Sequence, residues 1–344
     1  MSASVSESVN IPTSRLGRTG LIVSRLALGT MTFGLQTDEA TSFSILDKAT
    51  QAGINFLDTA DVYPLGGTVE SAGRTEEIIG KWLHGKGAGA RSRFILATKA
   101  ANRVGPDPWD QGNSRKHLLD AIDASLKRLR TDHVDLYQLH HDDRHTPIDE
   151  SLEALDTIVR SGRARYIGVS NFLSYRLARA IGRAELRRLT QLVSVQPRYS
   201  LLFREIEREL LPLADEEGLG VIPYNPLAGG LLTGKYKPGA RPEENTRFTL
   251  GTAGSMYQDR YWNERSFATV TQLHQLADEA GVPLATLAVA WVMANPLVTA
   301  PLLGASRPEQ LDATLAAASY TLDAGLKQRL DELTADYRKG DAPR

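Results

Sequence analysis

Short, mostly apolar runs alternate with amphipathic segments along most of this chain. Two such runs flank Arg18, Thr19 and Gly20, which predicts a β-hairpin, and a first strand is expected near residues 26–28. Further strands are expected in the runs INFLD, RFILATK, VDLYQLH, ARYIGVSN, LVSVQ, LGVIPY and LVTAPLLG. They are mostly apolar, as strands are when both faces of a parallel sheet are buried.

Amphipathic helices are expected between these strands, because apolar residues recur there with the helical period. The predicted helices cover SRKHLLDAIDASLKRLR, DESLEALDTIVRSG and residues 39–52, 75–84, 174–189, 206–217, 262–280, 283–294, 324–336 and a segment starting at 308. Gly53 and Gly218 follow two of them in the position where glycine often ends a helix. A long loop is expected at residues 225–261.

Eight short strands alternating with helices indicate parallel strands. Closing eight such units gives a (β/α)8, or TIM, barrel. The alternative is an open doubly wound sheet, which needs a glycine-rich turn after an early strand, and the sequence contains no GxGxxG motif. We therefore expect an α/β barrel with an N-terminal β-hairpin, a long loop after strand 7 and a C-terminal extra helix. A single domain at 14–338 would lie between tails at 1–13 and 339–344.

Composition excludes several classes of protein. The 344 residues include 40 Lys+Arg and 41 Asp+Glu, which leaves no basic surface of the kind that nucleic acid requires. Cysteine is absent, which excludes disulfides, thiolate metal sites and cysteine nucleophiles. The Ser-rich start does not resemble a signal peptide, and no apolar run approaches membrane-spanning length. We expect a soluble, cytoplasmic protein without nucleic-acid or membrane partners; its oligomeric state is not defined by the sequence.

Polar residues stand where several predicted strands end. Asp58 ends the second strand, Lys99 the third and His140 the fourth, and Tyr63 follows on the loop after Asp58. The C-terminal ends of the strands form the active-site face of such barrels, so neighbouring strands would place Asp58 beside Lys99 there. The carboxylate would keep a buried lysine cationic.

These four side chains predict a proton-donating site. A phenol has an unperturbed pKa of about 10, an adjacent ammonium lowers it, and an imidazole beside it can orient a carbonyl oxygen. Structural alternatives exist for each: Asp58 as a cap, Lys99 reaching solvent, Tyr63 packing a loop and His140 as a hydrogen-bonded structural histidine. Their coincidence at three successive strand ends favours the catalytic interpretation.

The segment HHDDRH, residues 140–145, invites comparison with a metal site. His140 and His141 would point to opposite faces of an extended chain. Asp142, Asp143 and His145 are expected in a solvated loop. We therefore expect no metal.

With these residues in place, the chain resembles the aldo-keto reductase family, from about Arg15 to Leu333. The resemblance rests on segments in the family's order and spacing: LALGTMTFG, GINFLDTADVY, LATK, DHVDLYQLH, GRARYIGVSNF, VQPRYSLL, PYNPLAGGLLTGKY and LLGASRPEQL. It covers bacterial-type members and also the potassium-channel β-subunit branch. It implies an oxidoreductase that reduces aldehyde or ketone carbonyls to alcohols with NADPH, or with NADH, bound across the barrel mouth.

The resemblance also implies a role for each polar residue. Tyr63 would be the general acid, and Lys99, salt-bridged to Asp58, would lower its pKa. His140 would orient and polarise the substrate carbonyl. Hydride would pass from the nicotinamide C4 to the carbonyl carbon.

Residues for the cofactor follow from the same resemblance. Ser170, Asn171 and Gln196 would bind the carboxamide, and Tyr224 would stack on the nicotinamide. Arg247 and Arg307 are candidates for the 2′-phosphate, since an arginine fork binds phosphate well. The other implied residues are Gly29, Thr30, Met31, Asp58, Asn225, Leu227, Gly229, Leu231, Lys235, Gly304, Ala305, Ser306, Gln310 and Thr314, with 225–235 over the pyrophosphate and 304–306 before a helix N-terminus that can hold phosphate. Capping by Ser170 and Asn171, core packing of Tyr224 and solvated arginines are the structural alternatives.

One position departs from the family. After PEQLD the family often has an acid and then an asparagine near the adenine, where this chain has Ala313 and Thr314. Substrate would contact variable loops at 100–113 and 251–261, with Trp109, Phe33 and either Tyr257 or Trp262 lining the pocket. The carbonyl substrate, the physiological direction and the strength of the NADPH preference are not defined by the sequence.

Two other functions remain open at this point. Lys99 could form a Schiff base, as in an aldolase on the same barrel, although a neighbouring carboxylate opposes the neutral amine this requires. The chain could also be a nucleotide-binding regulatory subunit with little turnover, like the channel-associated relatives.

Overall fold

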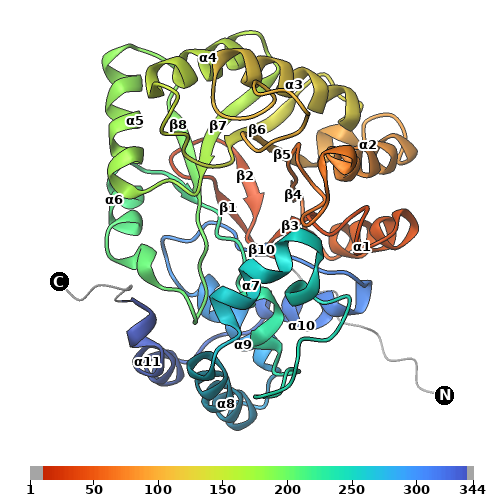
Figure 1. Ribbon diagram of the computed structural model, residues 1–344. Coiled ribbons are helices and arrows are strands. Elements are labelled where there is room, and N and C mark those ends of the chain that lie inside the picture. Colours follow the sequence, from red (N-terminus) through yellow and green to blue (C-terminus); the bar gives the residue numbers. More distant parts are fainter. Residues whose placement is uncertain (1–10, 339–344) are drawn as a thin grey trace.

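The computed structural model, which describes residues 11–338, contains an eight-stranded parallel sheet curled into a barrel (Figure 1). The strands follow the order β10-β3-β4-β5-β6-β7-β8-β9. Their bounds are β3 Ala27–Gly29, β4 Phe56–Asp58, β5 Ile95–Ala100, β6 Val134–Leu139, β7 Ala164–Ser170, β8 Leu192–Gln196, β9 Gly220–Val221 and β10 Leu302–Leu303. The backbone N–H groups of Thr299 and Leu302 donate to the carbonyls of Val221 and Pro223, each at 2.8 Å, which joins the two ends of the sheet. The predicted (β/α)8 barrel is confirmed.

Helices follow the strands around the outside of the barrel (Figure 1). Their bounds are α1 Glu39–Gln51, α2 Arg74–Gly85, α3 Arg115–Leu129, α4 Ile148–Arg160, α5 Ser174–Leu186, α6 Leu210–Glu216, α8 Glu264–Glu279, α9 Leu284–Met293 and α10 Leu311–Leu315. Polar side chains define several starts: Asp38 accepts from the Thr41 N–H at 2.7 Å, and Ser114 accepts from the His117 N–H at 3.2 Å. The apolar face of each helix then packs on the barrel, as its periodicity predicts.

The N-terminal hairpin fills one end of the barrel. It pairs β1 (Thr13–Arg15) with β2 (Ile22–Ser24) in antiparallel register. Leu16 and Val23 are fully buried in one apolar cluster with Phe56 and Leu136 of the barrel strands. The expected hairpin is confirmed, and β1 begins at the last residue of the expected tail. Residues 1–10 of that tail and the C-terminal tail at 339–344 lie outside the described residues.

The long segment after β9 is more structured than expected. It contains the unpredicted helix α7 (Gly254–Tyr261), and the helix expected from 262 begins instead at Glu264, where the Asn263 side chain accepts from the Ser266 N–H at 2.9 Å. The α7 sequence, GSMYQDRY, has no regular apolar period that would predict a helix. Packing supplies its stability instead, since Tyr257 and Tyr261 are buried against neighbouring segments of the loops around the cavity.

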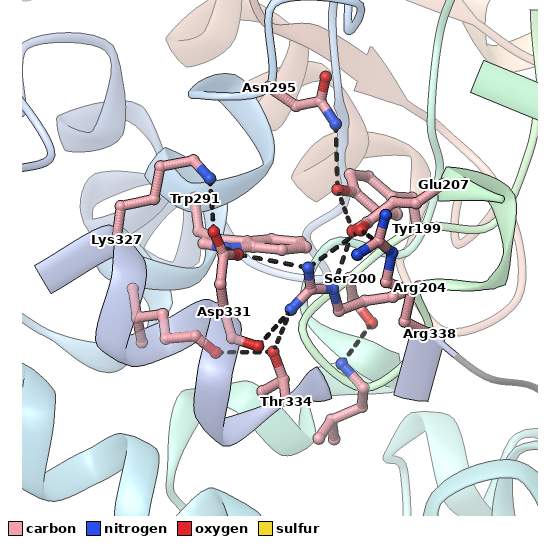
Figure 2. A network of polar contacts seen from close by, with 12 residues as sticks. Tyr199, Ser200, Arg204, Glu207, Trp291, Asn295, Lys327, Asp331, Thr334 and Arg338 are labelled. Carbon is pink, nitrogen blue, oxygen red and sulfur yellow. Dashed lines mark hydrogen bonds and ion pairs between the residues drawn. The ribbon is translucent and has the colours of Figure 1, made fainter. Parts of the chain in front are cut away.

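The C-terminal extra helix, α11 (Ala324–Leu333), is fastened to the segment that follows β8 (Figure 2). Arg204 is the centre of the contact. Its Nη1 donates to the Asp331 carbonyl and to Thr334 Oγ1, both at 2.9 Å, and its Nε donates to Glu207 at 2.8 Å. Its guanidinium also lies 5.0 Å from the ring of Trp291, whose indole N–H donates to Asp331 at 2.8 Å. A buried cation with several partners therefore holds the extra helix in place.

Candidate active site

The C-terminal ends of the strands open into one cavity of about 1190 Å³. Residues from β3, β4, β7 and β8 line its floor, and the loops that follow the strands form its walls. This is the end at which barrel enzymes bind their ligands, because each βα loop contributes side chains there. Asp58, Tyr63 and His140 therefore face a common space, and Lys99 lies beneath it.

Asp58 and Lys99 form a buried ion pair beneath this cavity. Lys99 Nζ lies 2.5 Å from Asp58 Oδ1 and donates to the Thr59 carbonyl at 2.7 Å. The other carboxylate oxygen, Oδ2, accepts from Gln196 Nε2 at 2.8 Å and from Gln138 Nε2 at 3.2 Å. Every partner of the pair is thus supplied from within the barrel, which is the condition for burying two charges. The predicted side-by-side placement of Asp58 and Lys99 is confirmed.

Tyr63 lies over this pair with its ring against His140. The Lys99 ammonium is 5.2 Å from the Tyr63 ring centroid, and the Tyr63 and His140 rings meet edge to face with centroids 5.7 Å apart. Burial, followed by the charge of Asp58, raises the pKa of Tyr63 well above its usual value, and Arg247 opposes this. The expected lowering of that pKa by Lys99 is wrong for this structure. Asp58, which pairs with Lys99, is itself among the groups that raise the Tyr63 pKa.

His140 is held from both sides in the cavity wall. Its backbone N–H donates to the Ala100 carbonyl at 2.9 Å, and its carbonyl accepts from Asn171 Nδ2 at 2.9 Å. The ring nitrogen Nδ1 lies 2.8 Å from Asn102 Nδ2. Burial and the positive charge of Lys99 lower the pKa of His140 well below its usual value, so the ring is neutral at pH 7.

Nearly all residues expected to bind the cofactor line the same cavity. They are Gly29, Thr30, Met31, Asp58, Ser170, Asn171, Gln196, Tyr224, Asn225, Leu227, Gly229, Lys235, Arg247, Gly304, Ser306, Arg307, Gln310 and Thr314. Leu231 is the exception: it is buried in the hydrophobic core and does not line the cavity. The chain turns at Gly229 and Gly230, both with positive φ, which directs the Leu231 side chain inward.

Three of these side chains form a hydrogen-bonded row. The Tyr224 hydroxyl donates to Asn171 Oδ1 at 2.8 Å, and Asn171 Nδ2 also approaches Ser170 Oγ at 3.0 Å. Ser170 Oγ in turn donates to the Gln196 carbonyl at 2.8 Å. Neither Ser170 nor Asn171 caps α5, since no side chain caps that helix. The row gives this side of the cavity a rigid polar surface.

The loop at 225–235 is shaped by its glycines and by Asn225. Asn225 Oδ1 accepts from the Gly229 N–H at 2.7 Å, and its Nδ2 donates to the Tyr261 hydroxyl at 2.9 Å. Gly229 has φ +71°, and a Cβ there would lie 2.8 Å from Tyr257. The Asn225 side chain therefore organises the loop, and the close approach of the loop to Tyr257 requires glycine.

The two candidate arginines for the 2′-phosphate lie in different surroundings. Arg247 stands beside Tyr257, with its guanidinium 5.5 Å from that ring, and its charge acts on Tyr63. Its Nη1 is buried without a hydrogen-bond partner among the described residues. Arg307 is exposed and precedes a single 3₁₀ turn, Pro308–Gln310, ahead of the five-residue α10. Ser306 N–H already donates to Gln310 Oε1 at 2.8 Å, so this short helix offers fewer free N–H groups than expected.

Three of the residues expected to line a substrate pocket do not do so. Phe33 is fully buried, Trp109 is 49% exposed beside Lys116, and Trp262 packs among Tyr236, Phe248 and Phe267. Tyr257 alone of the four aromatic candidates lines the cavity. The presence of an aromatic side chain therefore did not identify the residues that line the pocket, because large rings pack equally well in the core.

Two residues beside the site were missed from the sequence. Gln138 lies in β6 two residues before His140, and strand alternation could have identified it as a polar residue facing the same side as His140. Asn102 lies on the loop after β5, where no periodic pattern predicts side-chain direction. Only the return of this loop toward β6 brings its amide to His140.

Residues 11–338 contain neither a metal-binding cluster nor a single helix that could span a membrane. Within residues 11–338, no group of three or more His, Cys, Asp or Glu side chains could hold a metal ion. In the HHDDRH segment, Asp142 instead pairs with Arg176 at 2.8 Å, and only Arg144 and His145 are exposed, so the expected solvated loop is partly buried. No single helix in the described chain is long and apolar enough to cross a membrane. α8 and α9 reach that length and apolar character only when taken together, and they are bent by 92° at the break between them.

The barrel and the polar residues at its mouth together define an α/β-barrel enzyme class. A model described as "Aldo/keto reductase family" matches residues 25–335, so this chain belongs to that family. It is 44% identical over 327 residues to "Uncharacterized oxidoreductase YrpG" of Bacillus subtilis (strain 168), covering 92% of this chain and 94% of the relative. It is 38% identical to "Probable voltage-gated potassium channel subunit beta" of Arabidopsis thaliana, over 88% of this chain and 89% of the relative. It is 32% identical to "L-glyceraldehyde 3-phosphate reductase" of Escherichia coli (strain K12), over 93% of this chain and 91% of the relative.

Proposed function

We propose that this protein reduces aldehyde or ketone carbonyls to alcohols with NADPH. The observation that carries the proposal is the buried Asp58–Lys99 pair beneath Tyr63, with the His140 ring against the phenol at the floor of the cavity. Such a constellation combines a proton donor with a group that can orient a carbonyl oxygen. The family membership and the oxidoreductase names of two relatives support the same class of reaction.

The cavity residues fit a nicotinamide dinucleotide. The buried Nη1 of Arg247 has no hydrogen-bond partner within residues 11–338, as expected of a group that meets an anionic ligand. Ser170, Asn171 and Gln196 present polar atoms where a carboxamide can bind, and Tyr224 offers a ring for stacking. Arg307, exposed on the cavity rim, is the better candidate for a 2′-phosphate. When bound, the cofactor supplies the hydride.

Tyr63 would donate the proton that completes the reduction. Its raised pKa keeps the hydroxyl protonated at neutral pH, so the acid is in its donating form. An alkoxide is a much stronger base than a phenolate, so transfer to the developing alkoxide remains favourable. The Asp58–Lys99 pair would hold the Tyr63 ring in place from below.

Tyr63→Phe tests this proposal. The phenyl ring preserves the contacts with His140 and Lys99, so folding and NADPH binding, followed by protein fluorescence, should be retained. Carbonyl reduction should fall roughly 10²–10⁴-fold, the usual loss when a general acid is removed. Turnover within about threefold of the unmodified protein would reject the role of Tyr63.

Two alternative functions can be distinguished experimentally from carbonyl reduction. A Schiff-base aldolase needs an accessible neutral amine, but Lys99 is fully buried against Asp58 and does not line the cavity. Borohydride trapping with a carbonyl compound would reveal an adduct on Lys99 if that alternative held. The relatives named as channel subunits favour the second alternative, a nucleotide-binding regulatory protein. NADPH binding without turnover over a broad carbonyl panel would support it.

A further inference from the structure

We propose that Asn102 is a positioning residue whose amide holds the proton of His140 on Nε2. Resting on the proposed carbonyl reduction, this assigns His140 one protonation form and names the residue that selects it. His140 then donates its Nε2–H to the substrate carbonyl oxygen. Asn102 lines the cavity at the end of β5, next to the strand that carries His140.

The contact between the two side chains defines the direction of the hydrogen bond. Asn102 Nδ2 lies 2.8 Å from His140 Nδ1. An amide nitrogen can only donate, and a neutral imidazole carries a single N–H. With the Asn102 amide in this orientation, Nδ1 accepts, which leaves the proton of the neutral ring on Nε2. An imidazole with a bare Nε2 would instead turn a lone pair toward the lone pairs of a carbonyl oxygen.

The surroundings of His140 keep the ring neutral, so the choice between tautomers matters. The His140 ring is buried, and Lys99 and His141 lower its pKa further. No carboxylate is bonded to the His140 ring within residues 11–338. His133 provides a contrast in the same chain, since its Nδ1 lies 2.6 Å from the Asp132 carboxylate. A carboxylate in the place of the Asn102 amide would draw the proton to Nδ1.

The backbone places Asn102 for this contact. β5 ends at Ala100, whose carbonyl accepts from the His140 N–H at 2.9 Å, so the two strand ends are in register. Ala101, which is buried, then adopts φ +149°, a backbone conformation that residues other than glycine rarely adopt. Its carbonyl accepts from the Gly112 N–H at 2.7 Å, which holds the turn closed. The chain thus bends at Asn102 and brings its amide alongside the imidazole.

Nitrogen-15 NMR of the histidine rings tests the inference without any turnover. The His140 resonances are assigned by comparison with His140→Gln. In the unmodified protein, Nε2 should be protonated and Nδ1 unprotonated at pH 7. In Asn102→Asp, the carboxylate should raise the pKa of His140 and take the ring proton on Nδ1. Nδ1 protonation in the unmodified protein, or an unchanged tautomer in Asn102→Asp, would overturn the proposal.

The pH dependence of carbonyl reduction provides the functional readout. Asn102→Asp should stay active at low pH, where imidazolium still carries a proton on Nε2. It should lose about tenfold in kcat/KM as the pH rises through the raised pKa of His140, the effect of one lost hydrogen bond of about 1.4 kcal/mol. The unmodified protein should show no such loss.

Asn102→Leu is the matched control, because it has a similar volume but neither donates nor accepts. It adds no charge, so it should leave the shape of the pH profile unchanged; any loss it shows should be the same at every pH and reports the lost hydrogen bond together with packing. A pH profile of Asn102→Asp like that of Asn102→Leu would overturn the positioning role. If the unmodified protein reduces no carbonyl at all, the proposed function fails, and the NMR result still decides the tautomer.

Discussion

Replacing Lys99 by methionine should destabilise the protein strongly, because it removes one half of a buried ion pair. Lys99 is fully buried and Asp58 is 2% exposed. Methionine approximates the length of the lysine stem, so the apolar contacts of the side chain are largely kept. The change therefore isolates the ammonium, with its bonds to Asp58 at 2.5 Å and to the Thr59 carbonyl at 2.7 Å.

The size of the effect follows from what remains around Asp58. Removing one partner of a buried pair costs about 3–5 kcal/mol, chiefly because the other charge stays buried and uncompensated. Gln138 and Gln196 still donate to Asp58 Oδ2 in the variant. We therefore expect the lower end, about 3 kcal/mol of unfolding free energy, which corresponds to roughly 4 °C in Tm.

Urea unfolding followed by circular dichroism measures this loss, and a double-mutant cycle assigns it to the pair. Asp58→Asn/Lys99→Met removes both charges, so its loss should be smaller than the sum of the two single losses by at least about 1.5 kcal/mol. A loss below about 0.5 kcal/mol for Lys99→Met, or strictly additive losses, would refute the reasoning that burial makes the two charges interdependent.

Three further predictions concern other charged groups. Arg247→Ala should weaken NADPH and NADH to a similar extent, whereas Arg307→Ala should weaken NADPH alone by roughly tenfold; fluorescence titration decides, and a selective effect at Arg247 would reverse the assignment. Burial, then the charge of Glu76, raises the pKa of Asp61, whose carboxylate oxygens have no hydrogen-bond partner within residues 11–338. Since the unfolded carboxyl releases its proton at lower pH, Asp61 costs stability as the pH rises above about 4; Asp61→Asn should be the more stable in urea at pH 7, by a margin that shrinks toward pH 4, and equal stability at both pH values would contradict this. Arg204→Met should lose about 2 kcal/mol of unfolding free energy, because it removes the buried guanidinium that bonds Glu207, Thr334 and the Asp331 carbonyl, while Glu207 keeps Arg338 and the Tyr199 hydroxyl; a change under about 0.5 kcal/mol would show that the contact with α11 is dispensable.

The candidate site could be located from the sequence to the level of strand ends. Asp58, Lys99 and His140 each interrupt an apolar run at its C-terminal end, and the barrel rule then brings those ends together. The direction of the Tyr63 pKa could not be inferred in this way. It depends on where the Lys99 ammonium points and on how much water reaches the phenol, and neither is encoded in spacing along the chain.

The positions of loop side chains could not be predicted from the sequence for the same reason. Leu231, Phe33 and Trp262 have the residue types of a binding surface, but the structure uses them in the core. The helix α7 has no apolar period and exists because Tyr257 and Tyr261 are buried by their neighbours. Asn102 reaches His140 only because the chain bends there.

Local sequence pattern predicted the alternation of strand and helix, the parallel barrel, the hairpin and the extra helix. Each element must bury one face, and the spacing of apolar residues along the chain shows which face that is. The partners of each buried polar group were decided at the tertiary level. Asp58 receives bonds from Lys99, Gln138 and Gln196, which come from three different strands. Hydrogen bonds and charges act over a few ångströms in space, whatever the distance along the chain, so the chemistry of this site became defined only when the barrel closed.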